Sequence, residues 1–224
     1  TGYNSPAGSS HFGGALSCVD FLACLPEFWR IGSEQDSTYC RLTLSKGHAC
    51  LALYSFLYEQ GVITKDDLNT FDQNGSYLAG HPIRDIDKQI YFSTGSLGIG
   101  VSNAIGQALY FQNKLGIKSP KSCCILGDGE CAEGIVYESL RFAASQNLKN
   151  LIVFIDINNC QQTGRYDQIV PNLNPIDLCK NLGANHVHLT NGNSLSEIVD
   201  VIYSNTQIQQ ESLLLITADT IKGF

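Results

Sequence analysis

The chain has 224 residues, of which 21 are acidic and 14 basic, giving a formal net charge of −7. This length suits one large domain, and the acidic balance argues against binding to nucleic acid or to an anionic membrane surface. Charged residues make up only 16% of the sequence, below the usual proportion of about a quarter, so we expect part of the surface to be covered by another chain, because charged residues are depleted in interfaces.

The first hundred residues are dominated by helical periodicity. Helices are expected over 15–28 and 49–59, and Thr64 followed by Asp67 is typical of the capped start of a short helix. A longer helix is expected over 99–115, after a glycine-rich turn. We therefore predict a helical amino-terminal layer that packs against the rest of the fold.

The remaining residues alternate between short apolar runs and helical patterns. The apolar runs are rich in β-branched residues and are bounded by turn signals, which is typical of buried strands. Strands are expected over 122–126, 151–157 and 213–217, with a weaker one over 185–189, and helices over 133–144, 176–181 and 195–206. This alternation predicts an α/β fold with a doubly wound, mainly parallel sheet, helices on both faces, and ligands at the carboxyl ends of the strands. Since no repeat or linker is visible, residues 1–224 are expected to form a single domain.

The nine cysteines include no C-x-x-C pair, and their number is odd. Both features argue against a zinc site or a disulfide framework and favour buried, reduced thiols. No apolar stretch approaches the roughly 18 residues needed to span a bilayer, and residues 1–8 lack the pattern of a signal peptide. The sequence therefore predicts a cytoplasmic protein that acts on small molecules and contacts no membrane.

Two polar segments directly follow predicted strands. Gly127, Asp128 and Gly129 come after the first apolar run, and Asn158 follows the next one. The glycines allow a sharp turn and a close approach to a ligand, and the amino terminus of the following helix favours phosphate at the same place. A carboxylate beside phosphate requires a cation between them, so Asp128 and Asn158 predict a shared Mg²⁺ or Ca²⁺ ion. Taken singly, each segment is more often a tight turn or a loop.

Longer segments of the sequence resemble one enzyme family. The segment GDGECAEGIVYESLRFAASQNLKNLIVFIDINNCQQTG looks like the diphosphate-binding motif of thiamine diphosphate enzymes. Further segments are similar to transketolases, namely SSHFGGALSCVDFL, LSKGHACLALYSFLYEQG, AGHP, STGSLGIGVSNAIGQAL and TADTIKGF. The resemblance runs nearly end to end and is to the amino-terminal, diphosphate-binding subunit of those transketolases whose catalytic unit is divided between two polypeptides.

This resemblance implies that thiamine diphosphate and Mg²⁺, or Ca²⁺ in its place, are bound. The side chains of Asp128 and Asn158 and the main-chain carbonyl of Cys160 correspond to the metal ligands. The positions that correspond to cofactor-binding residues are Gly95, Ser96, Leu97, Gly127, Asp128, Gly129, Glu130 and Asn158.

Three histidines stand at motif positions that line the substrate channel in the family: His11, His48 and His81. Glu133 resembles a carboxylate that faces the subunit interface and couples two active sites. The resemblance thus implies these four as the catalytic residues. The histidines at 186 and 188 match no family position and are predicted to be structural.

The resemblance also implies a reaction and a partner. Transketolases transfer a two-carbon ketol unit from a ketose, often a ketose phosphate, to an aldose acceptor. The glutamate that activates their cofactor lies in a pyrimidine-binding domain, which we expect on a separate carboxy-terminal subunit, with a heterotetramer as the assembly.

Two alternatives remain for the function. The first is another thiamine diphosphate enzyme, either a 2-oxo-acid dehydrogenase subunit of alpha type or a deoxyxylulose-phosphate-synthase-like protein. The second is a biosynthetic-cluster paralogue with an unusual substrate. The LSKGH, AGHP and STGSLG segments favour transketolase over the first.

Overall fold

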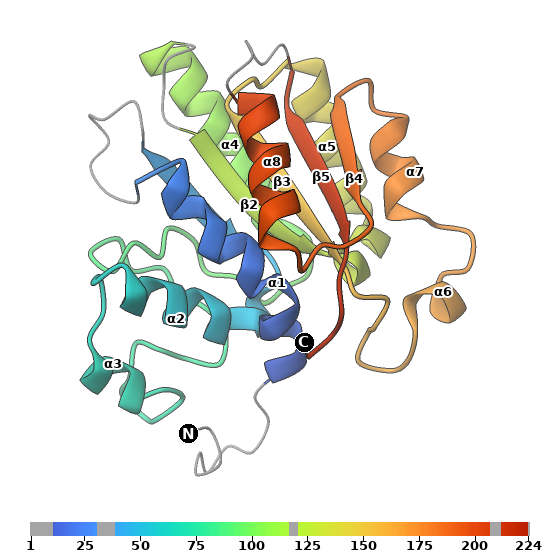
Figure 1. Ribbon diagram of the computed structural model, residues 1–224. Helices are drawn as coiled ribbons and strands as arrows, with labels where there is room; N and C mark the ends of the chain where they lie inside the picture. Colours follow the sequence, from blue (N-terminus) through green and yellow to red (C-terminus); the bar gives the residue numbers. More distant parts are fainter. Residues whose placement is uncertain (1–10, 31–38, 117–120, 207–211, 224) are drawn as a thin grey trace.

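A five-stranded sheet forms the centre of the fold (Figure 1). The computed structural model describes residues 11–30, 39–116, 121–206 and 212–223, so the prediction for residues 1–8 lies outside them. All strands run parallel, in the order β1-β2-β3-β5-β4. They are β1 (Cys40–Leu44), β2 (Lys121–Gly127), β3 (Leu151–Ile157), β4 (Asn185–Leu189) and β5 (Leu214–Asp219). The predicted parallel α/β sheet is therefore confirmed.

Helices cover both faces of this sheet. One face carries α1 (Phe12–Cys24), α2 (Cys50–Glu59) and α8 (Leu195–Thr206), and the other carries α4 (Ile99–Leu115), α5 (Gly134–Ser145) and α7 (Pro175–Lys180). Figure 1 looks onto the face with α1 and α8. The short helix α3 (Lys65–Asn69) packs against α2, and α6 (Tyr166–Ile169) lies in the connection between β3 and α7. Short 3-10 turns occur at Leu25–Glu27, Gly47–Ala49 and Asp128–Ala132.

Successive residues of the central strands β2, β3 and β5 face opposite helical layers. In β2, Cys123 and Ile125 pack on the side of α1, whereas Cys124 and Leu126 pack on the side of α4. On the first side, Phe21 of α1 stacks on a phenylalanine of β3 with ring centroids 4.0 Å apart. Because both faces are buried, these strands are continuous apolar runs in the sequence, which is why they could be predicted.

The predicted amino-terminal helices are present, but this part of the chain also holds a strand that was not predicted, because Cys40–Leu44 forms the edge strand β1. Polar residues interrupt its apolar run, and the half-buried Arg41 is covered by residues that are distant in sequence. The guanidinium of Arg41 lies over the rings of Tyr91 and Phe111, at 4.6 and 4.9 Å from their centroids. The sequence pattern alone does not reveal these contacts.

Helix ends follow local sequence signals. The helix expected over 15–28 begins earlier, at Phe12, and ends at Cys24, because Pro26 follows within a 3-10 turn and cannot continue an α-helix. The predicted cap at Thr64 is confirmed as a full capping box. Its hydroxyl accepts a hydrogen bond from the Asp67 N–H at 3.1 Å, and the Asp67 carboxylate accepts one from the Thr64 N–H at 2.8 Å.

The parallel arrangement places the carboxyl ends of four strands along one edge. Gly127 of β2 lies opposite Asp156 of β3, and Asp156 lies opposite Ala218 of β5. On the other side of β2, Leu44 of β1 lies opposite Ile125 of β2. The segments that leave these strand ends are therefore neighbours in space.

The glycines of α4 offer a test of this packing. A side-chain carbon at Gly100 would lie 2.5 Å from Ser45 Cα, whereas one at Gly106 would meet no atom within 4 Å. We expect Gly100→Ala to destabilise the chain by about 3 kcal/mol or more through overpacking against backbone. Gly106→Ala should stabilise it by about 1 kcal/mol, since alanine is the better helix former. Urea unfolding measures both, and equal stability of the two variants would contradict the close packing of α4 on the β1 end.

Candidate active site

The carboxylate of Asp128 is buried at the carboxyl end of β2, with 2% of the residue exposed. Its Oδ1 accepts a hydrogen bond from the Gly129 N–H at 2.8 Å, and its Oδ2 accepts one from the Asn159 N–H at 2.7 Å. Burial raises the pKa of Asp128 to about 6, although these two hydrogen bonds lower it. Within the described ranges, no basic side chain forms an ion pair with it. This setting favours a cation as its partner.

The carboxyl end of β3 brings Asn158 to the same place. Asn159 has a φ of 52°, a left-handed conformation that asparagine tolerates. This turn directs the Asn159 N–H to Asp128 and the Cys160 N–H to Asn158 Oδ1, at 3.0 Å. An isolated bridge between Cys160 and Arg165 then closes the loop. The three predicted metal ligands thus lie on one short loop and the neighbouring strand end.

These donors fit a hard divalent cation, because a carboxylate, an amide oxygen and a main-chain carbonyl are the ligands that Mg²⁺ and Ca²⁺ prefer. A second observation fits a phosphate. Gln161 Nε2 is buried without a hydrogen-bond partner in the described part of the chain, and a side-chain carbon at Gly129 would lie 3.7 Å from it. Groups of three or more His, Cys, Asp or Glu side chains that could hold a metal are absent from the described residues. The expected ligands include only one side chain of these types, that of Asp128, so this absence does not count against them. The metal site stays a prediction.

Below this loop lies a buried polar cluster centred on Asp156. Its carboxylate forms an ion pair with Lys46 and accepts hydrogen bonds from the hydroxyls of Ser17, at 2.6 Å, and Thr220. Burial by itself would raise the pKa of Asp156, but the charge and hydrogen bond of Lys46 outweigh it and hold this pKa below its ordinary value. The sequence pattern does not predict this cluster. Its one signal is Lys46 of the LSKGH segment, a charged residue two positions after the last residue of β1.

The carboxylate of Glu130 is also buried, with 1% of the residue exposed. It accepts hydrogen bonds from the Ser45 hydroxyl at 2.7 Å, the Gly98 N–H at 2.8 Å and the Gly127 N–H at 2.9 Å. Of these three donors, Ser45 follows β1, Gly98 precedes α4 and Gly127 ends β2. Glu130 therefore holds together three turns around the site, and a direct contact with a cofactor stays a prediction.

The structure brings the three predicted histidines together. The rings of His11 and His48 meet edge to face, with centroids 5.6 Å apart. His81 packs over Gly95, where a side-chain carbon would lie 3.1 Å from the ring. Burial, together with the charges of Lys46, His11 and His81, lowers the pKa of His48 to about 4, although the charge of Asp156 raises it. His48 is therefore a neutral imidazole at neutral pH.

This pKa predicts how stability depends on pH. Since the pKa of His48 falls from an ordinary 6.5 to about 4, its contribution is fully present above pH 6.5 and is lost as the pH falls toward 4. The loss is at most about 3 kcal/mol and is reduced by solvent because the ring is only partly buried. Urea unfolding across this window should give a flatter pH profile for His48→Gln than for the wild type. Parallel pH profiles of the two proteins would refute the lowered pKa of His48.

The remaining predicted residues are exposed. Gly95, Ser96 and Leu97 form a turn that ends at Gly98. This glycine directly precedes α4 and has a φ of 81°. The exposed residue Glu133 precedes α5, directly after the 3-10 turn of the GDGE segment. The structure thus places an acidic side chain and an open turn at the surface around the buried carboxylates.

The histidines of β4 lie elsewhere. His186 Nε2 and His188 Nδ1 both bond to Thr217 Oγ1, at 2.8 and 3.0 Å, and His188 Nε2 lies 3.4 Å from Asp219. These contacts tie β4 to β5, which fits the predicted structural role.

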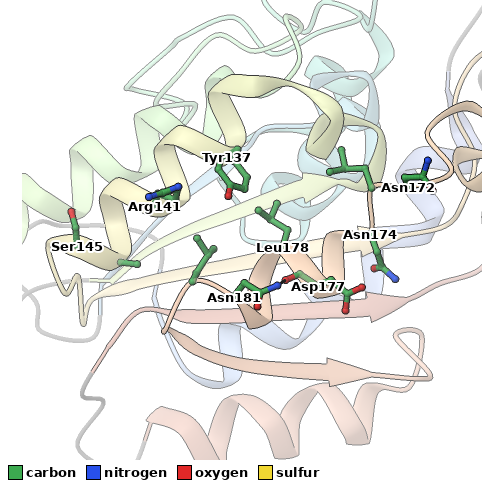
Figure 2. A pocket seen from close by; sticks show the side chains of 11 residues that line it. Tyr137, Arg141, Ser145, Asn172, Asn174, Asp177, Leu178 and Asn181 are labelled. Atoms are coloured by element: carbon green, nitrogen blue, oxygen red, sulfur yellow. Dashed lines mark hydrogen bonds between the residues drawn. The ribbon is translucent and has the colours of Figure 1, made fainter.

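Figure 2 shows a separate cavity of about 570 Å³ between α5 and α7. Tyr137 and Arg141 of α5 face Asp177 of α7 and Asn181, which directly follows α7, across it (Figure 2). None of the predicted site residues lines this cavity.

Two further features concern the cytoplasmic location that the sequence predicts: the state of the cysteines and the length of the apolar helices. All nine cysteines are free, and all but Cys160 are buried. No helix in the described part of the chain is both long and apolar enough to cross a membrane.

Comparisons with known proteins agree on one family. The family model described as the thiamine diphosphate binding domain of transketolase matches residues 4–224. An apulose-4-phosphate transketolase subunit of Phocaeicola vulgatus is 31% identical over 99% of this chain and 77% of its own length. The 6-deoxy-6-sulfo-D-fructose transketolase subunit SqwG of a Clostridium species is 34% identical over 96% of this chain and 78% of its own length.

A solved structure extends the agreement to three dimensions. The transketolase of Campylobacter jejuni superposes with a TM-score of 0.76 at 26% identity, covering 95% of this chain. The chain spans 38% of the length of that protein. It therefore belongs to the transketolase family of transferases, within which it corresponds to the thiamine diphosphate-binding domain.

Proposed function

We propose that the chain is the diphosphate-binding subunit of a Mg²⁺-dependent transketolase that transfers a two-carbon ketol unit from a ketose to an aldose. The observation that carries this proposal is the convergence of Asp128, Asn158 and Cys160 at two adjacent strand ends. Asp128 and Asn158 would bind the cation through side-chain oxygens and Cys160 through its carbonyl. The buried amide of Gln161, beside Gly129, would donate to a phosphate oxygen of the cofactor.

When bound, thiamine diphosphate supplies the electron sink that carbon–carbon bond cleavage beside a carbonyl requires. The histidines would act on the substrate. His48 is neutral at neutral pH and can accept a hydrogen bond from a sugar hydroxyl, since its pKa is lowered to about 4. His11 touches it, and His81 lies over the Gly95 turn. The three rings would bind the hydroxyl groups of the donor.

The proposed partner is a carboxy-terminal subunit with the pyrimidine-binding domain and the activating glutamate, and the proposed assembly is a heterotetramer. The names of two relatives as subunits support this. So does the exposed apolar surface at the starts of α4 and α5, where Leu97 and Ile135 are each about 40% exposed and Ile135 lies against Gly98. Glu133 lies beside this surface, where it would reach the partner.

A cytoplasmic location is part of the proposal. Nine free cysteines in the described chain fit a reducing compartment.

The test is a ketol-transfer assay with purified chain, Mg²⁺, thiamine diphosphate and a panel of ketoses that includes phosphorylated and sulfonated donors. Turnover is expected only after addition of the pyrimidine-domain subunit. Full turnover by the chain alone would overturn the divided site. Turnover with pyruvate but with none of the ketoses would overturn the transketolase reaction.

A further inference from the structure

The orientation of Asn158, a proposed metal ligand, is fixed by the buried carboxylate of Asp156, which is not itself one of the proposed ligands. Asn158 Nδ2 lies 3.2 Å from Asp156 Oδ2 and 3.3 Å from Ser17 Oγ. Asp156 is fully buried and paired with Lys46, so it is ionised and can only accept hydrogen bonds. The side-chain amide of Asn158 must therefore present its NH₂ group to Asp156.

The opposite side of the amide is fixed by the loop. Asn158 Oδ1 accepts a hydrogen bond from the Cys160 N–H at 3.0 Å. With the NH₂ group held by Asp156, a flip of the amide would break this bond and face Oδ1 toward a carboxylate. Oδ1 consequently points toward the loop that also carries the Cys160 carbonyl and the Asn159 N–H bound to Asp128.

The cluster around Asp156 is rigid because it joins four segments. Ser17 comes from α1, Lys46 follows β1, and Thr220 follows β5. Both carboxylate oxygens are engaged, Oδ2 by Ser17 and Lys46 and Oδ1 by Thr220. A residue held this way has one rotamer available and can act as a template for its neighbour.

We propose that Asp156 is a positioning residue that turns the amide oxygen of Asn158 toward the cation, and that its contact with Lys46 holds Asp156 in place for this purpose. The inference rests on the proposed function, since it assigns the support of the proposed metal site. Partners that orient a metal ligand typically change metal affinity about 10- to 100-fold.

Two double variants separate orientation from charge. Lys46→Met with Asp156→Asn, and Lys46→Met with Asp156→Leu, remove the same buried ion pair and leave the same net charge. Only the first keeps an oxygen that can accept from Asn158. Calorimetry and the electron paramagnetic resonance of Mn²⁺ measure the affinity of each variant for Mn²⁺ in the presence of thiamine diphosphate. We expect this affinity to be about 10- to 100-fold weaker in the leucine variant than in the asparagine variant. Equal affinity in two folded variants would overturn the inference.

A single variant gives an independent reading. Asn158→Asp adds a negative ligand, which by charge alone should tighten Mn²⁺ binding. If Asp156 orients this position, the new carboxylate meets another carboxylate, loses the donor, and binds Mn²⁺ more weakly than the wild type. Tighter binding would overturn the inference. If wild-type chain bound no Mn²⁺ with thiamine diphosphate while remaining folded, the proposed cofactor site itself would fail, which is a different result from unchanged affinity among variants.

Discussion

Replacing Asp128 with alanine should abolish Mg²⁺-dependent binding of thiamine diphosphate. The carboxylate is the one anionic side chain of the proposed metal set, and it is buried, so its attraction for a cation is little screened. We expect the affinity to fall by more than the roughly 10- to 100-fold typical of an outer-shell change. Calorimetric titration of the chain with the cofactor, with and without Mg²⁺, measures this effect.

Two variants control the measurement. Asp66→Ala removes the same charge from an exposed position of α3 and should leave cofactor affinity unchanged. Asp128→Asn keeps one oxygen donor and should give an intermediate affinity. In Asp128→Ala the N–H groups of Gly129 and Asn159 lose their acceptors, at about 1 kcal/mol each, so a folded protein is expected. Unchanged Mg²⁺-dependent affinity in Asp128→Ala would contradict the metal assignment.

The sheet was largely predictable because its strands are buried on both faces. Leu151–Ile157 and Lys121–Gly127 have only apolar or small residues along most of their length, and this requires no knowledge of distant contacts. The edge strand Cys40–Leu44 was missed for the opposite reason. Its Arg41 is covered by aromatic rings from elsewhere in the chain, and no local pattern encodes that cover.

The same division holds at the site. Asp128 and Asn158 could be found because strand ends with oxygen donors have a recognisable spacing, and the parallel register then brings them together. Lys46, Ser17 and Thr220 could not be found, since each is an ordinary polar residue until the fold gathers them around Asp156. Glu130 shows an intermediate case. Its place in GDGE was noticed, but its bonds to three separate turns emerge only from the tertiary structure.

Lys46→Met should strongly destabilise the chain. It leaves the carboxylate of Asp156 buried without a cation, and breaking a buried ion pair from one side typically costs about 3–5 kcal/mol. Lys180→Met is the matched control, because Lys180 and Asp177 form an exposed pair at 3.8 Å, and such pairs contribute about 0–1 kcal/mol. Urea unfolding of both variants measures the difference.

The second substitution decides the cause. Adding Asp156→Asn to Lys46→Met removes the unpaired charge while keeping an acceptor for the Ser17 hydroxyl and the amide of Asn158, so most of the lost stability should return. Recovery would show that the penalty of Lys46→Met comes from an uncompensated charge rather than from lost packing of the lysine stem. If the double variant were as unstable as the single one, the ion pair would not be the source of the loss, and Lys46 would act at this site mainly by filling space between α1 and β3.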